Sequence, residues 1–268
     1  MRITIALAIL VFSFALLGPC NLAFAQTPST GSGQAATDSA DITLEGLPSL
    51  DEVGAIDIGE SLVHPASPLY FLKALRERLE LLFATTTEAK MQRELEFAQR
   101  RLREIRALVK NKQQDLIPPT AERYKDHLQK AAEVALNNED LNFKVGEAVS
   151  RHLDTLQRVY DQVGNPRAKQ AILASIERVI EQNRTLLKKL DLVTQQKLIR
   201  ETALRQALAC KFLIRESSAS GKTDTEKVAL GEEVKKCQQN IRENLKDELM
   251  DIKQKKMMMQ GSPSANPR

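Results

Sequence analysis

Apolar residues recur every three or four positions along most of the chain that follows residue 67. The leucines of the first stripe are three, four and three residues apart: Leu72, Leu75, Leu79 and Leu82, with Phe71 and Phe83 beside them. This period predicts an amphipathic helix whose apolar stripe faces a core. Ser67 as N-cap and Pro68 as the first helical residue mark its start, because a missing N–H costs nothing there.

A second helix is predicted after the threonines at 85–87, which suit a helix cap better than a helix interior. Thr85, with Glu88 three residues later, fits a capping box. The apolar residues of this helix are four and three positions apart: Met91, Leu95, Ala98, Leu102, Ile105 and Val109. Such a seven-residue repeat favours a coiled-coil-like seam. The short connection predicts that the two helices form an antiparallel hairpin.

Proline and glycine divide the rest of the chain into further helices. Ile117, Pro118 and Pro119 are expected to end the hairpin, because proline lacks an N–H and disfavours helix at the residue before it. Gly164 is a C-cap signal that is followed by a proline start. The further helices are predicted over residues 121–136, 139–163, 166–216 and 226–256, the third either continuous or bent near 191–194.

These elements predict an all-α fold, an elongated helical bundle of antiparallel helical hairpins with coiled-coil-like seams and disordered N- and C-terminal tails. Composition agrees, because 11 glycines, 10 prolines and 4% aromatic residues in 268 are typical of long helices packed by aliphatic side chains. The predicted organisation is a helical domain over 64–190, a C-terminal helical hairpin over 191–260 and a disordered tail over 261–268.

The first 25 residues have the organisation of a secretory signal peptide. A positive start at Arg2, an apolar run over 3–17 and a small-x-small site predict cleavage between Ala25 and Gln26. An uncleaved anchor and a lipid on Cys20 are the alternatives. We therefore expect an exported protein, periplasmic or extracellular, with no transmembrane span after processing.

Charge is distributed unevenly along the chain. Residues 26–63 hold seven acidic residues and no Lys or Arg, which gives this segment a charge of −7. Since the whole chain carries +4 and residues 1–25 carry +1, residues 64–268 carry +10. The low-complexity sequence at 27–34 predicts a disordered acidic linker over 26–63. This linker is either a solvated spacer or a segment that folds back on the basic helices.

Two cysteines remain after the predicted cleavage, Cys210 and Cys237. An even pair in an oxidising compartment favours a disulfide. Both cysteines are equally far from the middle of a loop predicted at 217–225, so an antiparallel helical hairpin would place them side by side. Neither has the Cys-x-x-Cys pattern of a redox centre, and we interpret the pair as structural.

Motifs that would carry catalysis are incomplete in this sequence. Residues 220–223 (SGKT) resemble the end of a phosphate-binding loop, but Glu216 stands where the leading glycine belongs. His64, His127 and His152 are isolated and lack metal-ligand spacing. We therefore expect no enzymatic activity, no cofactor and no metal site.

A run of basic residues lies on the second helix. Its members are Arg100, Arg101, Arg103, Arg106, Lys110 and Lys112, which spread around the helix among Glu94, Glu96 and Glu104. Nucleic acid would need the charge on one side, with aromatic residues for single strands, so we expect no nucleic-acid partner. A solvated, ion-paired surface is expected, with contact to anionic lipid or polymer as the alternative.

The stretch 64–73 (HPASPLYFLK), with Arg76-Glu77-Arg78-Leu79 and residues 94–104 (ELEFAQRRLRE), resembles a family of exported bacterial proteins known as domain of unknown function 5667. The resemblance covers residues 62 to about 190. It implies a secreted or envelope-associated helical protein without an assigned activity, so it supplies no catalytic residues. The triple threonine and the cysteine-bearing terminal hairpin depart from the family pattern.

We expect an exported, non-enzymatic helical interaction or scaffold module of the bacterial envelope. Its partner would be an envelope or extracellular protein, bound in the grooves between helices. The alternative is a peripheral binder of anionic lipid or wall polymer through a basic helical surface. A hydrolase would require histidine and acidic side chains to converge in one pocket. The sequence leaves the oligomeric state open.

Overall fold

The computed structural model describes residues 44–61, 63 and 65–261. Every regular element within these residues is helical, which confirms the prediction of an all-α fold. The predicted signal peptide, the cleavage site between Ala25 and Gln26, and the predicted tail from residue 262 onward lie outside the described residues.

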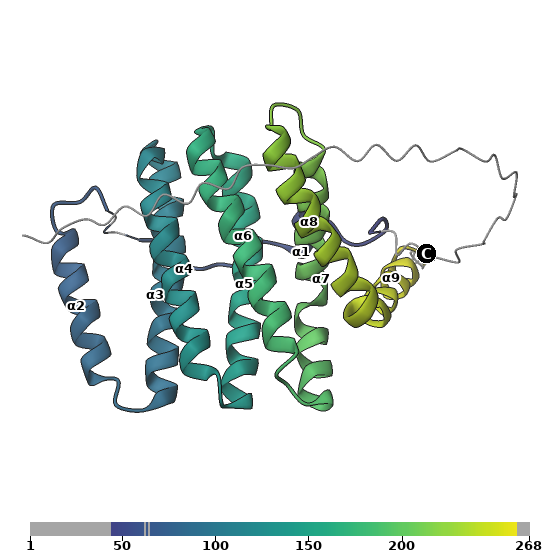
Figure 1. The fold of residues 1–268 in the computed structure, drawn as a ribbon, viewed down its shortest axis with the longest axis horizontal. Helices are drawn as coiled ribbons and strands as arrows, with labels where there is room; N and C mark the ends of the chain where they lie inside the picture. The colour runs from purple at the N-terminus through teal and green to yellow at the C-terminus, as the bar shows by residue number, and fades with distance from the viewer. Residues whose placement is uncertain (1–43, 62, 64, 262–268) are drawn as a thin grey trace, which may run out of the picture. The chain divides into compact units, whose positions relative to one another are not determined.

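The helices follow one another along the chain with short connections from α2 onward (Figure 1). They are α1 (Leu50–Val53), α2 (Tyr70–Phe83), α3 (Thr87–Lys110), α4 (Ile117–Ala135), α5 (Glu139–Gln162), α6 (Pro166–Leu187), α7 (Leu192–Ser217), α8 (Asp224–Asn240) and α9 (Lys246–Gly261). A 3₁₀ turn at Gln114–Leu116 precedes α4, and a π-helical turn at Ile241–Leu245 joins α8 to α9. Each helix from α2 to α7 contacts its successor, α5 also packs on α7, and α9 packs on α7 and on the π-helical turn.

Side-chain caps set most of the helix starts. The capping residues have extended backbone, and a side-chain oxygen of each accepts a hydrogen bond from an N–H of the first turn. They are Thr86, Asn138, Asn165, Asp191 and Thr223. The capping box predicted for Thr85 was therefore wrong by one residue, and Glu88 pairs with Lys144 instead.

Two other predicted boundaries were wrong. α2 begins at Tyr70 rather than at Pro68, because the Ser67 carbonyl accepts the Tyr70 N–H in a preceding turn. Pro118 lies in the first turn of α4 rather than between helices, since that turn needs no N–H donor from it. The long helix predicted from Pro166 is divided into α6 and α7, with the break in the predicted region.

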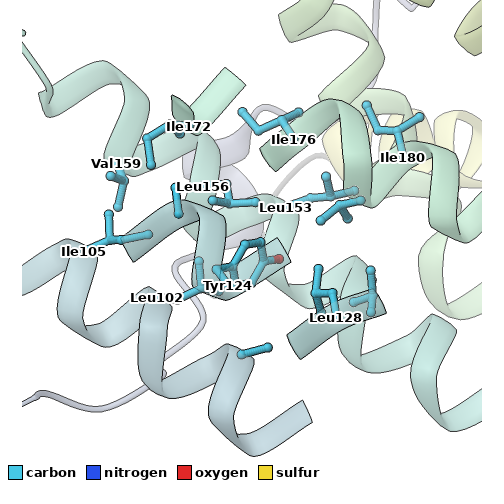
Figure 2. Packing of buried hydrophobic residues seen from close by; sticks show 14 of the residues in the cluster. Leu102, Ile105, Tyr124, Leu128, Leu153, Leu156, Val159, Ile172, Ile176 and Ile180 are labelled. Carbon is cyan, nitrogen blue, oxygen red and sulfur yellow. The ribbon is translucent and has the colours of Figure 1, made fainter. Parts of the chain in front are cut away.

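The main core lies between α3, α4, α5 and α6. Figure 2 shows side chains from these four helices meeting, among them Ile105, Tyr124, Leu153 and Ile176. The stripe predicted for α3 supplies one side of this core, with Met91, Ala98, Leu102 and Ile105 almost wholly buried. Burial of each large aliphatic side chain stabilises the fold by about 2 kcal/mol relative to exposure.

Contacts with α7 extend this core past residue 190, where a domain boundary was expected. Gly146 of α5 lies so close to Leu198 of α7 that an added Cβ would be 2.7 Å from its side chain. Farther along, the Tyr160 ring meets the Phe212 ring edge to face at 4.9 Å, and the Tyr160 hydroxyl donates to Glu216 at 2.6 Å. The turn between α6 and α7 therefore separates two helices of one packed unit.

Residues 44–61, which we call the strap, cross several helices (Figure 1). Leu47 is buried in a second cluster with α7 and α8, and Ile58 is buried in the main core. On α5, Arg158 binds the Leu50 carbonyl and Asp51, while buried Asp154 accepts the Ile56 N–H. The expectation of disorder up to residue 63 was wrong for the strap, because these few apolar and polar contacts hold it to the helices. Residues 26–43, for which a disordered linker was also predicted, lie outside the described part of the chain.

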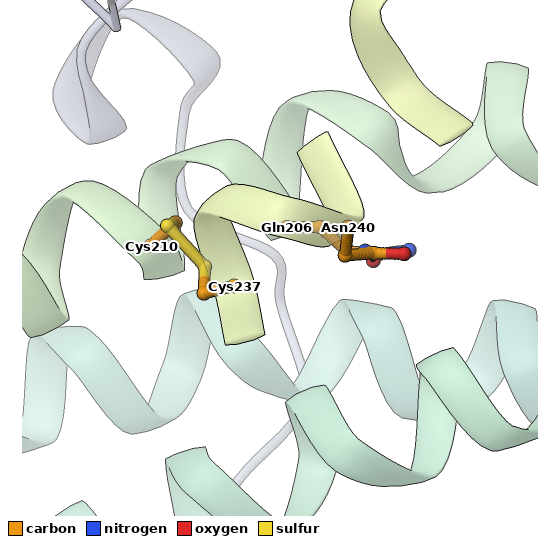
Figure 3. The surroundings of a disulfide bond; sticks show 4 residues. All are labelled: Gln206, Cys210, Cys237 and Asn240. Carbon is orange, nitrogen blue, oxygen red and sulfur yellow. A yellow bond between two sulfur atoms is a disulfide. The ribbon is translucent and has the colours of Figure 1, made fainter. Parts of the chain in front are cut away.

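A disulfide joins α7 to α8. Cys210 and Cys237 are both buried, with their Cα atoms 5.8 Å apart and their sulfurs bonded (Figure 3). One turn away, the Asn240 side chain donates to Gln206 at 3.2 Å. The cysteines thus lie opposite each other on neighbouring helices, as their equal distance from the connecting loop predicts.

Candidate interaction surface

The side of α2 that faces α3 is polar. Glu77 pairs with Arg101, and Lys73 pairs with Glu104 at 2.6 Å. The same Arg101 also holds Glu104 at 2.5 Å, so one guanidinium bridges two carboxylates. Glu77, Arg101 and Glu104 are all buried. Burying charges is costly unless they are paired and hydrogen-bonded. Each of these three charges is paired, while Glu77 Oε1 and Arg101 Nε have no hydrogen-bond partner among the described residues.

Tyr70 completes the polar contact between α2, α3 and α4. Its hydroxyl donates to Glu104 at 3.3 Å and accepts hydrogen bonds from Arg101 at 2.6 Å and Arg123 at 2.7 Å. Burial, reinforced by the negative charge of Glu104, raises the pKa of Tyr70 to about 12. The phenol therefore stays protonated and keeps its donor over the physiological pH range.

The opposite side of α2 is apolar and open to solvent. We call it the α2 apolar face, and it consists of Phe71, Leu72, Leu75, Leu79, Leu82 and Phe83. These side chains are between 45% and 80% exposed. The prediction that this stripe faces a core was therefore wrong. Periodicity identified the stripe correctly, but the polar side of the helix is the one that contacts α3.

The α2 apolar face exposes a large apolar area to solvent. At roughly 170 Å² for a fully exposed residue of this size, the six residues expose about 600 Å². The largest apolar patch on a typical monomer covers roughly 300–600 Å² and is often functional. We therefore regard this face as the candidate functional site.

Two arginines border the α2 apolar face, one on each side. Leu72, Leu75, Leu79 and Leu82 occupy the a and d positions of a heptad, which places Arg76 at e and Arg78 at g. Arg76 pairs with Glu80 at 2.6 Å, and Glu80 in turn pairs with Arg100 of α3. Arg78 makes no ion pair with the residues that the structure describes. The exposed charge beside the apolar face is thus positive on both flanks.

The sequence contained a signal for the buried polar side that was overlooked. Tyr70, Lys73, Glu77 and Glu80 are spaced three, four and three residues apart, just as the leucines are. A polar stripe as regular as the apolar one indicates a helix with two specific faces. The identity of the neighbour that each face meets comes only from the structure.

The histidines predicted to be isolated lie in separate surroundings. His127 pairs with Glu94 at 2.7 Å beside the Phe97 ring, while His152 is buried and its Nδ1 is 3.2 Å from the Tyr124 hydroxyl. Burial, with a smaller effect of Arg151, lowers the pKa of His152 to about 3, so its imidazole is neutral. His64 lies outside the described residues, and among those described no group of three His, Cys, Asp or Glu is placed to hold a metal ion.

The remaining candidate segments have structural roles. Gly221, in the sequence that resembles a phosphate-binding loop, has φ +90°, and Thr223 caps α8 in a capping box with Glu226. Half of the basic run is ion-paired within the described residues: Arg100 binds Glu80 and Glu96, buried Arg101 binds Glu77 and Glu104, and Lys110 binds Glu60. Within the part of the chain that the structure describes, each helix falls short of the length or apolarity of a bilayer span.

Comparison with known proteins finds similarity at the family level. No curated protein and no solved structure matches this chain. The family model described as domain of unknown function (DUF5667) matches residues 62–166, which contain α2, α3, α4 and α5. The match confirms the resemblance predicted from the sequence and ends before the predicted limit near 190. The matched residues 62–166 include the whole α2 apolar face.

Proposed function

We propose that this protein is an exported helical interaction module whose contact surface is the α2 apolar face. The observation that carries the proposal is that α2 buries a polar side and exposes an apolar one. Exposed apolar surface of this size is unfavourable in water at about 25 cal/mol per Å². A partner that covers it would regain part of that free energy, less the entropy lost on association.

The ion pairs between α2 and α3 support this proposal, because they resist rotation of the helix. A turn of α2 about its axis would bury the leucines, but it would also expose or unpair Glu77, Arg101 and Glu104. Leaving one partner of a buried ion pair alone costs about 3–5 kcal/mol. The cluster therefore holds the apolar face outward, in the orientation that a partner requires. The proposed role is binding rather than catalysis.

Photo-crosslinking tests the proposed function with a closely matched control. A photoreactive residue is placed at Leu82, which is 75% exposed on α2, or at Leu192, which is 76% exposed at the start of α7. Irradiation of cells that export the protein should give a discrete adduct from position 82 and none from 192. Leu75→Glu in the same chain should remove that adduct. Equal labelling from both positions, or none from either, would refute the proposal.

A second candidate function is peripheral binding of anionic lipid or wall polymer. The charge of +10 over residues 64–268 favours it, but the ion pairing of α3 supports it less. Sedimentation with vesicles of phosphatidylglycerol, compared with phosphatidylcholine, tests it at two salt concentrations. Binding that needs anionic lipid and weakens steeply with salt would favour this function over an apolar protein contact.

A further inference from the structure

The α2 apolar face and its flanking charges together indicate the chemistry of the partner. We infer that the α2 apolar face binds an amphipathic helix of another protein, with an apolar stripe of its own and acidic residues beside that stripe. This inference rests on the proposed function and specifies its partner.

The spacing of the leucines is the first step of the argument. Leu72, Leu75, Leu79 and Leu82 form two successive a and d pairs, which is the pattern that packs side chain into hole against another helix. Phe71 and Phe83 extend the face at its two ends, where they are 66% and 80% exposed. The face spans the 14 residues of α2, so it matches about two heptads of a partner helix.

The flanking charge is the second step. Positions e and g set partner choice in coiled coils, because their side chains meet those of the facing helix. On α2 the inner e and g positions are Arg76 and Arg78, while Phe83 and Phe71 occupy the outer ones. Arg78 has no carboxylate partner within the described part of the chain. Carboxylates on the facing helix would pair with these guanidinium groups in charge-assisted hydrogen bonds. The face therefore selects acidic over basic flanks.

The same charges disfavour a second copy of this chain as the partner. Two α2 helices packed face to face would bring arginine near arginine beside the seam. Such like charges across an interface disfavour association. A lipid surface is also less well matched. Clusters of roughly four to eight Lys or Arg mark binding to anionic lipid. Beside the α2 apolar face Arg76 is paired with Glu80, and of the basic residues that share a groove with Leu72, Lys73 is paired with Glu104 and Arg100 with Glu80 and Glu96.

Designed peptide probes test the inference directly. Two helical peptides of about three heptads carry Leu at a and d and differ only at e and g, which are Glu in one and Lys in the other. Fluorescence anisotropy with the purified protein should show the Glu peptide binding roughly tenfold more tightly than the Lys peptide at low salt. The preference should shrink toward roughly twofold near 1 M salt, where charge is screened.

Variants at exposed positions keep the test independent of folding. Leu82→Glu should abolish binding of the Glu peptide, while the matched Leu192→Glu should leave it unchanged. Arg78→Glu should reverse the preference toward the Lys peptide, which a loss of folding would not do. Circular dichroism should report the same helicity for all three variants.

Four results would overturn the inference. They are equal binding of the two peptides, binding that survives Leu82→Glu, self-association of the protein through position 82 in sedimentation, and binding to anionic vesicles in place of peptide. Each of these is compatible with an adduct from position 82 in cells, and so leaves the proposed function standing. Absence of that adduct would refute the proposed function itself. Failure of the inference and failure of the proposed function are therefore distinguishable.

Discussion

Replacement of Arg101 by methionine removes the guanidinium that bridges α2 and α3. In the native protein this group binds Glu77 of α2 and Glu104 of its own helix, and all three side chains are buried. Methionine has a similar length and restores much of the apolar volume. The change therefore tests the charge of Arg101 rather than its packing.

The structure sets the expected magnitude. Loss of one partner from a buried ion pair costs about 3–5 kcal/mol, because the other charge is left without compensation. Lys73 still lies 2.6 Å from Glu104, and Arg100 lies 3.8 Å from Glu77, so part of the compensation remains. We therefore expect a loss of about 3 kcal/mol. Since α2 makes its main contact with α3, the loss should appear as local detachment of α2.

Hydrogen–deuterium exchange measures this detachment residue by residue. A loss of about 3 kcal/mol corresponds to exchange of the α2 amides roughly a hundredfold faster, with α5 and α6 almost unaffected. Arg93→Met is the control, because Arg93 is half exposed on α3 and its one ion pair among the described residues is with the partly exposed Glu96. Its effect should be within about 0.5 kcal/mol. Unchanged protection of α2 in Arg101→Met would show that the ion pairs do not hold the helix.

Three further outcomes are expected from single positions. Because burial lowers the pKa of His152 to about 3, the unfolded chain binds a proton below pH 6.5 that the folded chain does not. The free energy of unfolding should fall by about 2 kcal/mol from pH 7 to pH 5, and His152→Gln should show a flatter profile in urea titrations. Gly231→Ala should raise the melting temperature, because it adds about 1 kcal/mol of helix stability and the new Cβ contacts nothing. Gly146→Ala should lower the melting temperature, because the new Cβ would press on the Leu198 side chain. Cys237→Ser opens a loop of 27 residues and should cost about 3–4 kcal/mol in the same titration, and an unchanged midpoint would contradict the disulfide.

Local signals in the sequence were sufficient for most helix positions. The α3 stripe was predicted correctly because its heptad is long and is buried between neighbours on several sides. The ends of α5 were predicted within a residue, since Asn138 caps one end and Gly164 follows the other. Proline was misleading at position 118, because the same residue ends one helix or starts another depending on where the first turn falls.

Long-range contacts account for what the sequence did not indicate. Whether the α2 apolar face is buried or exposed depends on which side chains α3 presents to α2. Arg101 and Glu104 of α3 form ion pairs with the polar side of α2 or beside it, so the apolar side is left exposed. The strap was missed because Leu47 and Ile58 are far apart in a polar segment and show no period. Each is buried by helices that are distant from it in sequence.

The packing of α5 against α7 affects how the residues that match the family model, 62–166, can be expressed as a separate fragment. A fragment cut at residues 62 and 166 would end before α6 and α7, and would strip the neighbours from Gly146 and Tyr160. It would also lose the strap residue Ile58 from the far side of the same helices. Such a fragment should aggregate when expressed alone. A piece that keeps these buried contacts runs from the strap into α9, because Leu245 and Leu249 pack in the cluster that holds Leu47.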